Sequence, residues 1–505
     1  MASFRFSLIK LKSMQTELVL RKVHNLTCNK AFVNGKWVTA QSGKMFDVYN
    51  PATGDVVASV PDMNVEDFQD AIKKAYDAFA TWKNTTAKER SHHLRNWFNL
   101  MMQNQEELAK LMTAEQGKPV KESAGEIVYA ASFFEWYSEE CRRIYGEVVP
   151  APVANKEMMF IRQPIGVAAM ITPWNFPSAM ITRKVGAALA AGCTCVIKPS
   201  EDTPLSALAL GKLAEAAKIP PGVVNILTAS SENAPAVGKL LCESPQVAGL
   251  SFTGSSDVGK LLYQQSASTV KKLSLELGGN APFIVFDSAN LDQAVSGILA
   301  SKFRNSGQTC VSANRILIQE GIHDRLVRKL AEAMKKTLIV GDGFDSTTTQ
   351  GPLINRQQAL QVDEKVKDAV DKGARVLIGG KFHSKGDLFY EPTLITEAKG
   401  NMRICQEEIF GPVAVITRFR TEDDALALAN ASNAGLAGYF YSNDISQAWR
   451  VAKRLEVGMV GINDGLISCA EGAFGGVKES GIGREGSRHG IDEYTNIKYI
   501  CFGNL

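Results

Sequence analysis

Cys310 lies in the segment 303-FRNSGQTCVSANR-315, whose glycine and polar residues are typical of a loop. A lone cysteine is usually a small buried apolar residue, and we interpret the other eight cysteines in that way. Cys310 differs because residues 307–309 should end the preceding helix and leave the thiol in a loop. A thiolate is a good nucleophile towards a carbonyl carbon, so the segment predicts a nucleophilic cysteine.

Two further polar residues, Glu276 and Asn175, lie near the ends of apolar runs. Glu276 interrupts the otherwise apolar pattern of 275-LELGGN-280, and the glycines after it suggest that another group approaches the backbone closely. A solvated glutamate at the edge of a sheet would explain the same pattern. Asn175 lies in 174-WNFP-177, a sequence that is also typical of a turn. Both residues are therefore candidates whose function depends on their neighbours.

The segment 251-SFTGSSDVGKLL-262 resembles a phosphate loop, because a glycine, four residues, a second glycine and a lysine follow an apolar run. The strand 283-FIVFD-287 likewise resembles the one whose aspartate holds magnesium in nucleotide hydrolases. Leu261, however, stands where a serine or threonine hydroxyl must bind the metal. Gly254 and Ser255 can still form an anion site at a helix N-terminus. A diphosphate without a metal fits better, which points to a dinucleotide bound without the usual G-x-G-x-x-G fingerprint.

The composition is that of an ordinary soluble globular protein. The chain has 505 residues, of which 45% are hydrophobic and 22% charged, so we expect two or three domains. The net charge of +3 gives no argument for nucleic acid, and no apolar run is long enough to span a membrane. Nine scattered cysteines, an odd number, indicate a reduced intracellular protein. Cys193 and Cys195 have no neighbouring pair or histidine cluster, so we expect no metal site.

The first thirty residues differ from the rest of the chain. They contain six basic residues and one acidic residue, Glu17, and apolar residues alternate with the basic ones. This pattern is typical of a mitochondrial transit peptide, so we expect residues 1–30 to direct the chain to the mitochondrial matrix. An N-terminal extension on a cytoplasmic enzyme is the alternative.

The elements that must position these residues follow from the hydrophobic pattern. Residues 31–38 predict a hairpin around Asn34-Gly35, residues 65–139 a helical region and residues 145–162 an extended segment. Strand and helix patterns then alternate, which predicts βαβ units and an α/β fold with a doubly wound domain, a second α/β domain and a C-terminal tail. The predicted strands are 165–171, 194–198, 223–227 and 247–252 in a first set, and 282–286, 315–319 and 458–463 in a second. The predicted helices include 203–219 and one that ends near Asn305.

Four polar or glycine-rich clusters follow the predicted strands. They are 172–177, 198–201, 253–259 and 276–280. Ligands of open parallel sheets bind beyond the carboxyl ends of the strands, so these clusters predict a common site.

Seven motifs together resemble the aldehyde dehydrogenase superfamily. In family order they are TPWNFP, KPSE, FTGSSDVG, LELGGN, GQTC, 407-EEIFGPV-413 and 474-FGGVKESG-481. The resemblance covers residues 31 to 505 and implies the aldehyde dehydrogenase-like fold. It implies an NAD-binding domain formed by residues 31–145 and 165–276, and a catalytic domain over residues 277–481. Family members associate through the segment 146–164 and the tail 482–505, which implies a homotetramer built as a dimer of dimers.

The resemblance also implies a mechanism. Cys310, as a thiolate, would attack the carbon of an aldehyde. The Asn175 amide and the Cys310 backbone N–H would hold the oxyanion, and such a donor is typically worth ~3 kcal/mol. After hydride passes to the cofactor, Glu276 would activate the water that hydrolyses the thioester.

The cofactor implied by the family is NAD. Lys198 and Glu201 would bind the adenosine ribose hydroxyls, and a carboxylate at Glu201 would repel the 2′-phosphate of NADP, so we expect NAD over NADP. Ser255 would contact the pyrophosphate and Glu408 the nicotinamide ribose. The other cofactor positions implied by the resemblance are Trp174, Gly254, Gly259 and Phe410.

Arg183 and Arg304 flank the predicted channel and could clamp a carboxylate through paired donors, although surface or ion-pairing arginines would give the same pattern. Segments such as 435-GLAGYFYS-442 and 457-VGMVGINDGLIS-468 resemble the succinate-semialdehyde dehydrogenase subfamily. There the substrate carboxylate is bound by residues matching Arg183, Arg304 and Ser468. The resemblance therefore implies oxidation of succinate semialdehyde to succinate in 4-aminobutyrate degradation. Glutarate semialdehyde, or a broader range of aliphatic aldehydes, is the alternative.

Two positions depart from the family pattern. Ser312 stands where many members of the subfamily have a second cysteine, so we expect no regulatory disulfide with Cys310. Ala473 precedes Phe474, where the family commonly has proline. A different class of enzyme, a thiol hydrolase or acyltransferase, would use Cys310 without NAD. It normally needs a histidine partner, and none of the six histidines lies at a strand-end cluster.

Overall fold

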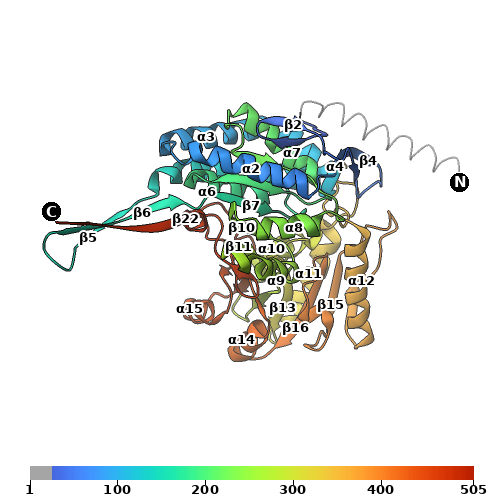
Figure 1. Cartoon of the computed structure of the whole chain (residues 1–505). Coiled ribbons are helices and arrows are strands. Elements are labelled where there is room, and N and C mark those ends of the chain that lie inside the picture. The colour runs from blue at the N-terminus through green and yellow to red at the C-terminus, as the bar shows by residue number, and fades with distance from the viewer. Residues whose placement is uncertain (1–25, 505) are drawn as a thin grey trace.

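The computed structural model describes residues 26–504, so most of the predicted targeting segment 1–30 lies outside the described residues. Figure 1 shows two α/β bodies, one formed mainly by the N-terminal half of the chain and one mainly by the C-terminal half, with a long ribbon that projects to one side. The α/β fold class predicted from the alternating pattern is confirmed.

The first body is built on a sheet of eight strands. In spatial order they are β2 (Lys36–Val38), β1 (Ala31–Val33), β9 (Val224–Ile226), β8 (Thr194–Lys198), β7 (Val167–Ile171), β10 (Val247–Thr253), β11 (Lys272–Glu276) and β21 (Gly481–Ile482). The strands from β9 to β11 are parallel, as the first set of predicted strands requires. From β7 the strands that follow in sequence, β8 and β9, lie on one side, whereas β10 and β11 lie on the other side. The boundary between β7 and β10 is therefore the switch point, where a doubly wound sheet binds its ligands.

Helices cover both faces of this sheet. They are α2 (Val65–Trp82), α3 (Ala87–Gln103), α4 (Gln105–Gln116), α5 (Val120–Glu140), α6 (Ala179–Ala191), α7 (Pro204–Ala216), α8 (Ala234–Glu243) and α9 (Ser256–Ser266). Along β7, Ala168 and Met170 belong to one hydrophobic cluster, and Val167 and Ala169 belong to another. This alternation follows from the period of two in a strand and buries both faces. The helical region predicted at 65–139 is four separate helices, the first two of which begin with capping boxes.

The edge strand β21 comes from far along the chain. It pairs antiparallel with β11, so that Gly481 lies opposite Glu276. The Leu277 N–H also donates to the Ser480 carbonyl at 2.9 Å. The strand pairing therefore places the C-terminal region beside Glu276, which the hydrophobic pattern did not indicate.

The second body contains a sheet of seven strands. In spatial order they are β14 (Arg375–Ile378), β15 (Thr393–Thr396), β16 (Val413–Phe419), β13 (Ala313–Gln319), β12 (Ala281–Val285), β18 (Ala437–Tyr441) and β19 (Met459–Ile462). Its helices are α10 (Leu291–Phe303), α11 (His323–Thr337), α12 (Arg356–Asp371), α13 (Arg403–Gln406), α14 (Glu422–Asn430) and α15 (Ile445–Arg454). All neighbouring strands are parallel except β14 and β15, and the second set of predicted strands is confirmed.

The projecting ribbon is a three-stranded antiparallel sheet, which we call the arm. It consists of β5 (Glu147–Val149), β6 (Lys156–Pro164) and β22 (Thr495–Gly503). β22 pairs with β6 along its whole length, from Thr495 opposite Pro164 to Gly503 opposite Lys156. The two segments predicted to mediate oligomerisation therefore pair with each other within the chain. Their pairing with a second chain stays a prediction.

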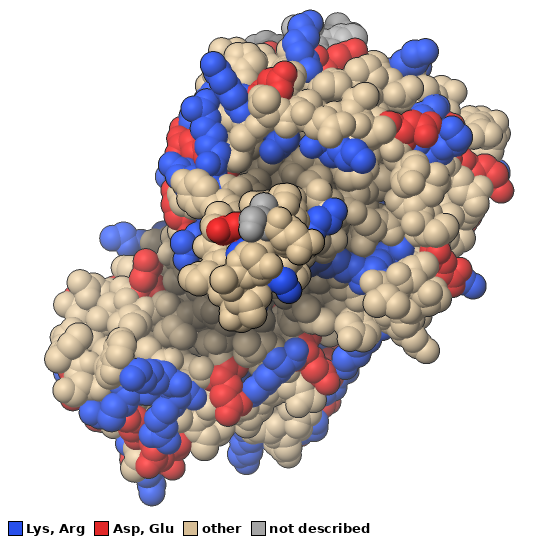
Figure 2. Space-filling view, turned by 60° about the vertical axis from the view of Figure 1, so that its left-hand side comes forward, with Lys and Arg blue, Asp and Glu red and all other residues tan. Residues whose placement is uncertain are grey.

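Shorter elements complete the fold. They are the strands β3 (Met45–Tyr49), β4 (Val56–Pro61), β17 (Ala434–Gly435) and β20 (Val477–Lys478), and the 3₁₀ helices η1 (Cys141–Arg143), η2 (Ala267–Thr269), η3 (Arg304–Gly307) and η4 (Arg488–Tyr494). Figure 2 looks towards the arm and shows Lys and Arg side chains interleaved with Asp and Glu over that face. Among the described residues, no helix is long and apolar enough to cross a membrane.

Candidate active site

A pocket of about 250 Å³ lies at the switch point of the first sheet, and residues of the second body line its other side. Most of the site residues predicted from the sequence line this one pocket. They are Trp174, Asn175, Gly254, Ser255, Glu276, Cys310, Glu408 and Phe410. These residues come from strand ends, a helix N-terminus and two loops that are distant in sequence, so the fold has brought together separate motifs.

The loop that carries Cys310 leaves α10 by an unusual backbone path. The helix ends at Phe303, and Asn305 and Ser306 both have positive φ values of 51° and 53°. The helix thus ends before Cys310, as predicted, but it ends earlier than the 307–309 segment. Asn305 fixes the turn, because its side-chain amide donates to the Asn175 carbonyl at 2.9 Å and its side-chain oxygen accepts from Gln116 at 3.0 Å. This strained turn places the thiol at the pocket wall.

Cys310 is partly exposed at the pocket wall, and its backbone lies against the 276–280 loop. Burial raises the pKa of the Cys310 thiol to about 12, while the charge of Arg183 lowers this pKa. A Cβ atom on Gly279 would collide with the Cys310 carbonyl oxygen. The predicted close approach at this glycine pair is therefore the backbone of Cys310 itself.

Asn175 is buried beside the Cys310 loop, with 4% of its surface exposed. One N–H of its side-chain amide donates to the Gln308 carbonyl at 3.0 Å, and its side-chain oxygen accepts from the Phe176 backbone N–H at 3.1 Å. An amide nitrogen has two N–H groups, so a second donor remains for a group in the pocket. The interpretation of Asn175 as only a turn residue is therefore insufficient.

A buried ion pair supports the loop that carries Asn175, and no local pattern in the sequence indicated it. The Lys118 ammonium donates to Glu126 at 2.6 Å and to the Asn175 carbonyl at 2.7 Å. Glu126 in turn accepts from the Ser178 backbone N–H at 3.0 Å. These contacts join the start of α5 to the start of α6 and fix the 172–177 segment.

Glu276 is the last residue of β11 and is only 2% exposed, so the alternative of a solvated edge residue is wrong. Neither of its side-chain oxygens has a hydrogen-bond partner within residues 26–504. Burial raises the pKa of this carboxyl well above its usual range, and the charge of Glu485 raises it further. A buried carboxyl without partners is costly, which marks Glu276 as a candidate for function.

The predicted phosphate-binding loop has the expected helix-capping geometry. Ser255 is the N-cap of α9, where its side chain accepts from the Val258 N–H at 3.4 Å. Gly254 and Gly259 lack room for a Cβ atom, because it would collide with the Phe252 ring and with Leu277 respectively. Gly259 does not line the pocket.

Two acidic residues stand at the ends of the predicted cofactor site. Lys198, at the end of β8, pairs with Glu201 at 3.0 Å, and neither residue lines the pocket itself. Glu408 accepts from the Gly279 N–H at 3.2 Å, and burial raises the pKa of its carboxyl to about 8. The rings of Phe410 and Trp174 meet edge to face at 5.5 Å on the pocket wall.

The three residues predicted to hold a carboxylate do not line the main pocket. Arg183 is 1% exposed on α6, and its Nε pairs with Glu485. Arg183 is therefore not a surface arginine, and that alternative is wrong. It does form an ion pair within the protein, but only through Nε. Arg304 and Ser468 line a small hollow beside Val311. The guanidinium of Arg304 lies 4.7 Å from the Phe176 ring.

Glu485 was not found by sequence reasoning. It pairs with both Arg183 and Lys184, and Lys184 also donates to the Ser251 hydroxyl at 3.0 Å. All of these groups are buried within the first body. The pairing joins residues about three hundred positions apart through the strand pairing of β21, so no local pattern could reveal it.

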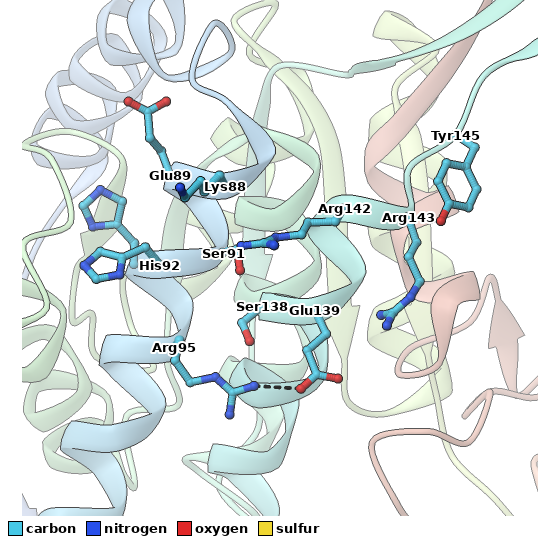
Figure 3. Close-up of a pocket in the computed structure, with 11 residues that line it drawn as sticks. Lys88, Glu89, Ser91, His92, Arg95, Ser138, Glu139, Arg142, Arg143 and Tyr145 are labelled. Carbon is cyan, nitrogen blue, oxygen red and sulfur yellow. Dashed lines mark hydrogen bonds and ion pairs between the residues drawn. The ribbon is translucent and has the colours of Figure 1, made fainter.

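A hollow of about 770 Å³ lies elsewhere, between α3, α5 and η1, and is larger than the main pocket (Figure 3). Its charged groups are largely solvated or paired. Arg95 pairs with Glu139 and Glu135 at 2.7 Å each, and Arg143 pairs with Glu140 at 2.9 Å. Cys310 and Glu276 are not part of it.

Comparisons with known proteins show which family and fold this chain shares. Residues 37–500 match the model of the aldehyde dehydrogenase family. The chain is 57% identical over 475 residues to the human protein named succinate-semialdehyde dehydrogenase, mitochondrial, with 94% of this chain and 88% of the relative covered. It is 54% identical to the Escherichia coli succinate-semialdehyde dehydrogenase named as NADP(+)-dependent, with 95% of this chain and 98% of the relative covered. Betaine aldehyde dehydrogenase from Staphylococcus aureus in complex with NAD+ has a similar structure, with a TM-score of 0.93, 34% identity and 97% of each chain covered.

Proposed function

This chain belongs to the aldehyde dehydrogenase family, and on that premise we propose that it oxidises succinate semialdehyde to succinate with NAD as the hydride acceptor. The observation that carries the proposal is the shared pocket of Cys310, Asn175 and Glu276. A nucleophile, an uncharged donor and a buried carboxyl in one enclosed space are the groups that aldehyde oxidation through a thioester requires.

Cys310 supplies the nucleophile. Its sulfur, as thiolate, bonds to the aldehyde carbon, and the carbonyl oxygen becomes an oxyanion. The free N–H of the Asn175 amide and the Cys310 backbone N–H then donate to that oxyanion, and removing such a donor typically costs ~3 kcal/mol. NAD, which Ser255, Glu408 and Phe410 would hold, would supply the acceptor for the hydride of the former aldehyde carbon. This carbon then becomes the carbonyl of a thioester on Cys310.

Glu276 completes the reaction as a general base. Its carboxylate takes a proton from water, the water oxygen bonds to the thioester carbon, and the carbon–sulfur bond breaks. Succinate leaves, and the Cys310 thiolate is restored. Because Glu276 has no hydrogen-bond partner within the described chain, its oxygens are free to accept a proton from water.

The pocket and the residues beside it fit NAD in three respects. The N-terminus of α9, with Ser255 and Gly254, offers backbone N–H groups to a pyrophosphate. Lys198 and Glu201 stand beyond the neighbouring strand, where a ribose could bind both. A Cβ atom on residue 278 would lie only 2.9 Å from a carboxylate oxygen of Glu408. Glycine at this position therefore keeps the space beside the Glu408 carboxylate open. Lys260, the residue of the phosphate-loop alternative, instead pairs with Glu479 at 2.8 Å on the surface.

The choice of NAD over NADP rests on Glu201. Its carboxylate can accept hydrogen bonds from a free ribose 2′-OH and would repel a 2′-phosphate. The Escherichia coli relative is named for NADP, so similarity alone does not fix the cofactor. Steady-state kinetics with both cofactors tests the assignment, and a higher kcat/KM with NADP than with NAD would overturn it.

The specificity for an ω-carboxylate rests on Arg183, Arg304 and Ser468. The terminal nitrogens of Arg183 are buried and have no hydrogen-bond partner in the described chain, and Arg304 and Ser468 line one hollow. A substrate carboxylate would supply the missing acceptor. The deciding experiment measures cofactor reduction with matched pairs of aldehydes, namely succinate semialdehyde with butanal, and glutarate semialdehyde with pentanal. We expect kcat/KM to be highest for succinate semialdehyde. Equal values within both pairs would exclude the carboxylate specificity and leave a broad aliphatic aldehyde dehydrogenase.

The arm and the N-terminal segment suggest how the enzyme assembles and where it acts. The arm exposes apolar side chains, among them Val148 (75% exposed) and Ile497 (67%), as expected for a surface that is covered in a homotetramer. Truncation before β22 should break up the assembly, so that light scattering gives the mass of fewer subunits.

The human relative is named mitochondrial, which supports residues 1–30 as a transit peptide. A fluorescent protein fused behind residues 1–30 should enter mitochondria, and one fused without them should not.

A further inference from the structure

Tyr129 lies between the two arginines of the proposed carboxylate site, although no motif pointed to it. It belongs to α5, and its ring packs edge to face against Phe133 at 5.0 Å. The Arg304 guanidinium lies 6.0 Å from the centre of the Tyr129 ring. Burial raises the pKa of the Tyr129 hydroxyl, while the charges of Arg183 and then Arg304 lower it, so both guanidinium groups lie close to it.

The surroundings of Tyr129 contain donors without acceptors. Both terminal nitrogens of Arg183 are buried and have no hydrogen-bond partner in residues 26–504, because only Nε is held by Glu485. Arg304 has aromatic neighbours on both sides, Phe176 and Tyr129, and no carboxylate partner in the same range. Glu485 holds Arg183 at Nε, but burying the terminal N–H donors of Arg183 without acceptors is still costly. These donors can therefore serve a ligand that accepts hydrogen bonds, such as a carboxylate.

We propose that Tyr129 is a further specificity-determining residue, whose hydroxyl donates to the carboxylate of the aldehyde while its ring holds Arg304 in place. The inference rests on the proposed function, since it requires a substrate with an ω-carboxylate. The Tyr129 hydroxyl is the uncharged donor of the set. It adds a directed hydrogen bond to two ionic contacts, and a bond to a charged acceptor is stronger than one to a neutral acceptor. Tyr129 does not take part in bond making at Cys310.

Tyr129→Phe tests the hydroxyl alone, because the ring and its packing against Phe133 and Arg304 are kept. We expect KM for succinate semialdehyde to rise about tenfold, as for loss of one hydrogen bond to a charged group, with kcat changed little. KM for butanal, which has the same chain length and no carboxylate, should stay unchanged. Succinate should also inhibit the variant about tenfold more weakly. If the hydroxyl had a purely structural role, KM would change equally for both aldehydes. That result would overturn the proposal.

Tyr76→Phe is the matched control, since it removes a hydroxyl from the exposed face of α2, far from the pocket lining. Arg304→Gln separates the two proposals. If Arg304→Gln loses the preference for succinate semialdehyde over butanal and Tyr129→Phe keeps it, the Tyr129 inference fails and the proposed function stands. If the wild-type enzyme shows no such preference, both fail. Circular dichroism of each variant verifies that the fold is retained.

Discussion

Two hollows of this molecule are lined by titratable side chains, and they differ in what those side chains contact. In the main pocket, Glu276 has no hydrogen-bond partner within residues 26–504, and burial raises the pKa values of Cys310 and Glu408. In the larger hollow between α3 and α5, Arg95 pairs with two glutamates. Glu89 there has a lowered pKa because it accepts the Thr86 backbone N–H.

The volume of a hollow therefore does not identify the reactive site of this molecule. The hollow is about 770 Å³ and the pocket about 250 Å³, yet only the pocket holds groups whose charged forms are destabilised by burial. Leaving such groups without partners costs free energy, which a fold sustains where the groups serve chemistry. Paired and solvated charges, as in the hollow, contribute little to stability and need no functional explanation.

The largest effect should follow from Cys310→Ser. An alcohol is a far weaker nucleophile than a thiolate at neutral pH, so kcat should fall at least about a thousandfold. The measurement is cofactor reduction with succinate semialdehyde. Cys28→Ser, which changes a partly exposed cysteine outside the pocket, is the matched control and should keep full activity. Residual activity within tenfold of the wild type would place the nucleophile elsewhere.

Glu276→Gln should block the second half of the reaction more than the first. The amide cannot take a proton from water, so kcat should fall by about 10²- to 10⁴-fold. A rapid burst of reduced cofactor, close to one equivalent per active site, should remain in stopped-flow traces because the thioester still forms. The wild-type rate should rise with pH, since the pKa of the Glu276 carboxyl is raised and only its carboxylate is the base. Loss of the burst together with turnover would assign Glu276 to the first step.

Removing the charge of Arg183 should shift the pH profile of the first step. Arg183 lowers the pKa of the Cys310 thiol, so Arg183→Gln should raise this pKa and reduce the thiolate fraction at neutral pH. We expect kcat/KM for butanal to fall about tenfold at neutral pH and to recover at higher pH. Arg183→Lys keeps the positive charge and is the matched control. An unchanged profile in Arg183→Gln would show that its charge does not act on the thiol.

Much of this arrangement could be predicted from the sequence because strand ends carry local signals. The polar clusters after β7, β10 and β11 identified Asn175, Ser255 and Glu276, and the topology of parallel strands brought them to one edge. The loop signal at Cys310 was also sufficient, although Asn305 and Ser306, rather than residues 307–309, make the sharp turn.

The contacts that hold these residues could not be predicted, because they join distant positions. Glu485 reaches Arg183 because β21 pairs with β11. Lys118 supports the Asn175 loop from the turn between α4 and α5. Each of these partners is an ordinary charged residue in its local sequence. Tyr129 is similar, since its place on a helix facing Arg304 depends on how α5 packs against α6. Burial, which decides the pKa shifts, is likewise a property of the whole fold.

The smallest effect should come from the larger hollow, and it tests the comparison directly. Arg142, near the centre of that hollow, is exposed and has no ion-pair partner in the described chain, so Arg142→Ala removes a solvated charge (Figure 3). Substitutions of this kind usually change stability by less than about 0.5 kcal/mol, so the melting temperature should hardly move. We expect kcat and KM for succinate semialdehyde to stay within about twofold of the wild type, since a screened surface charge acts only over roughly 10 Å. His92→Ala serves as the matched change of a second exposed residue in the same hollow. A tenfold loss of activity in both variants, with the fold intact, would mean that paired and solvated groups can be as important to this enzyme as the buried, unpaired ones.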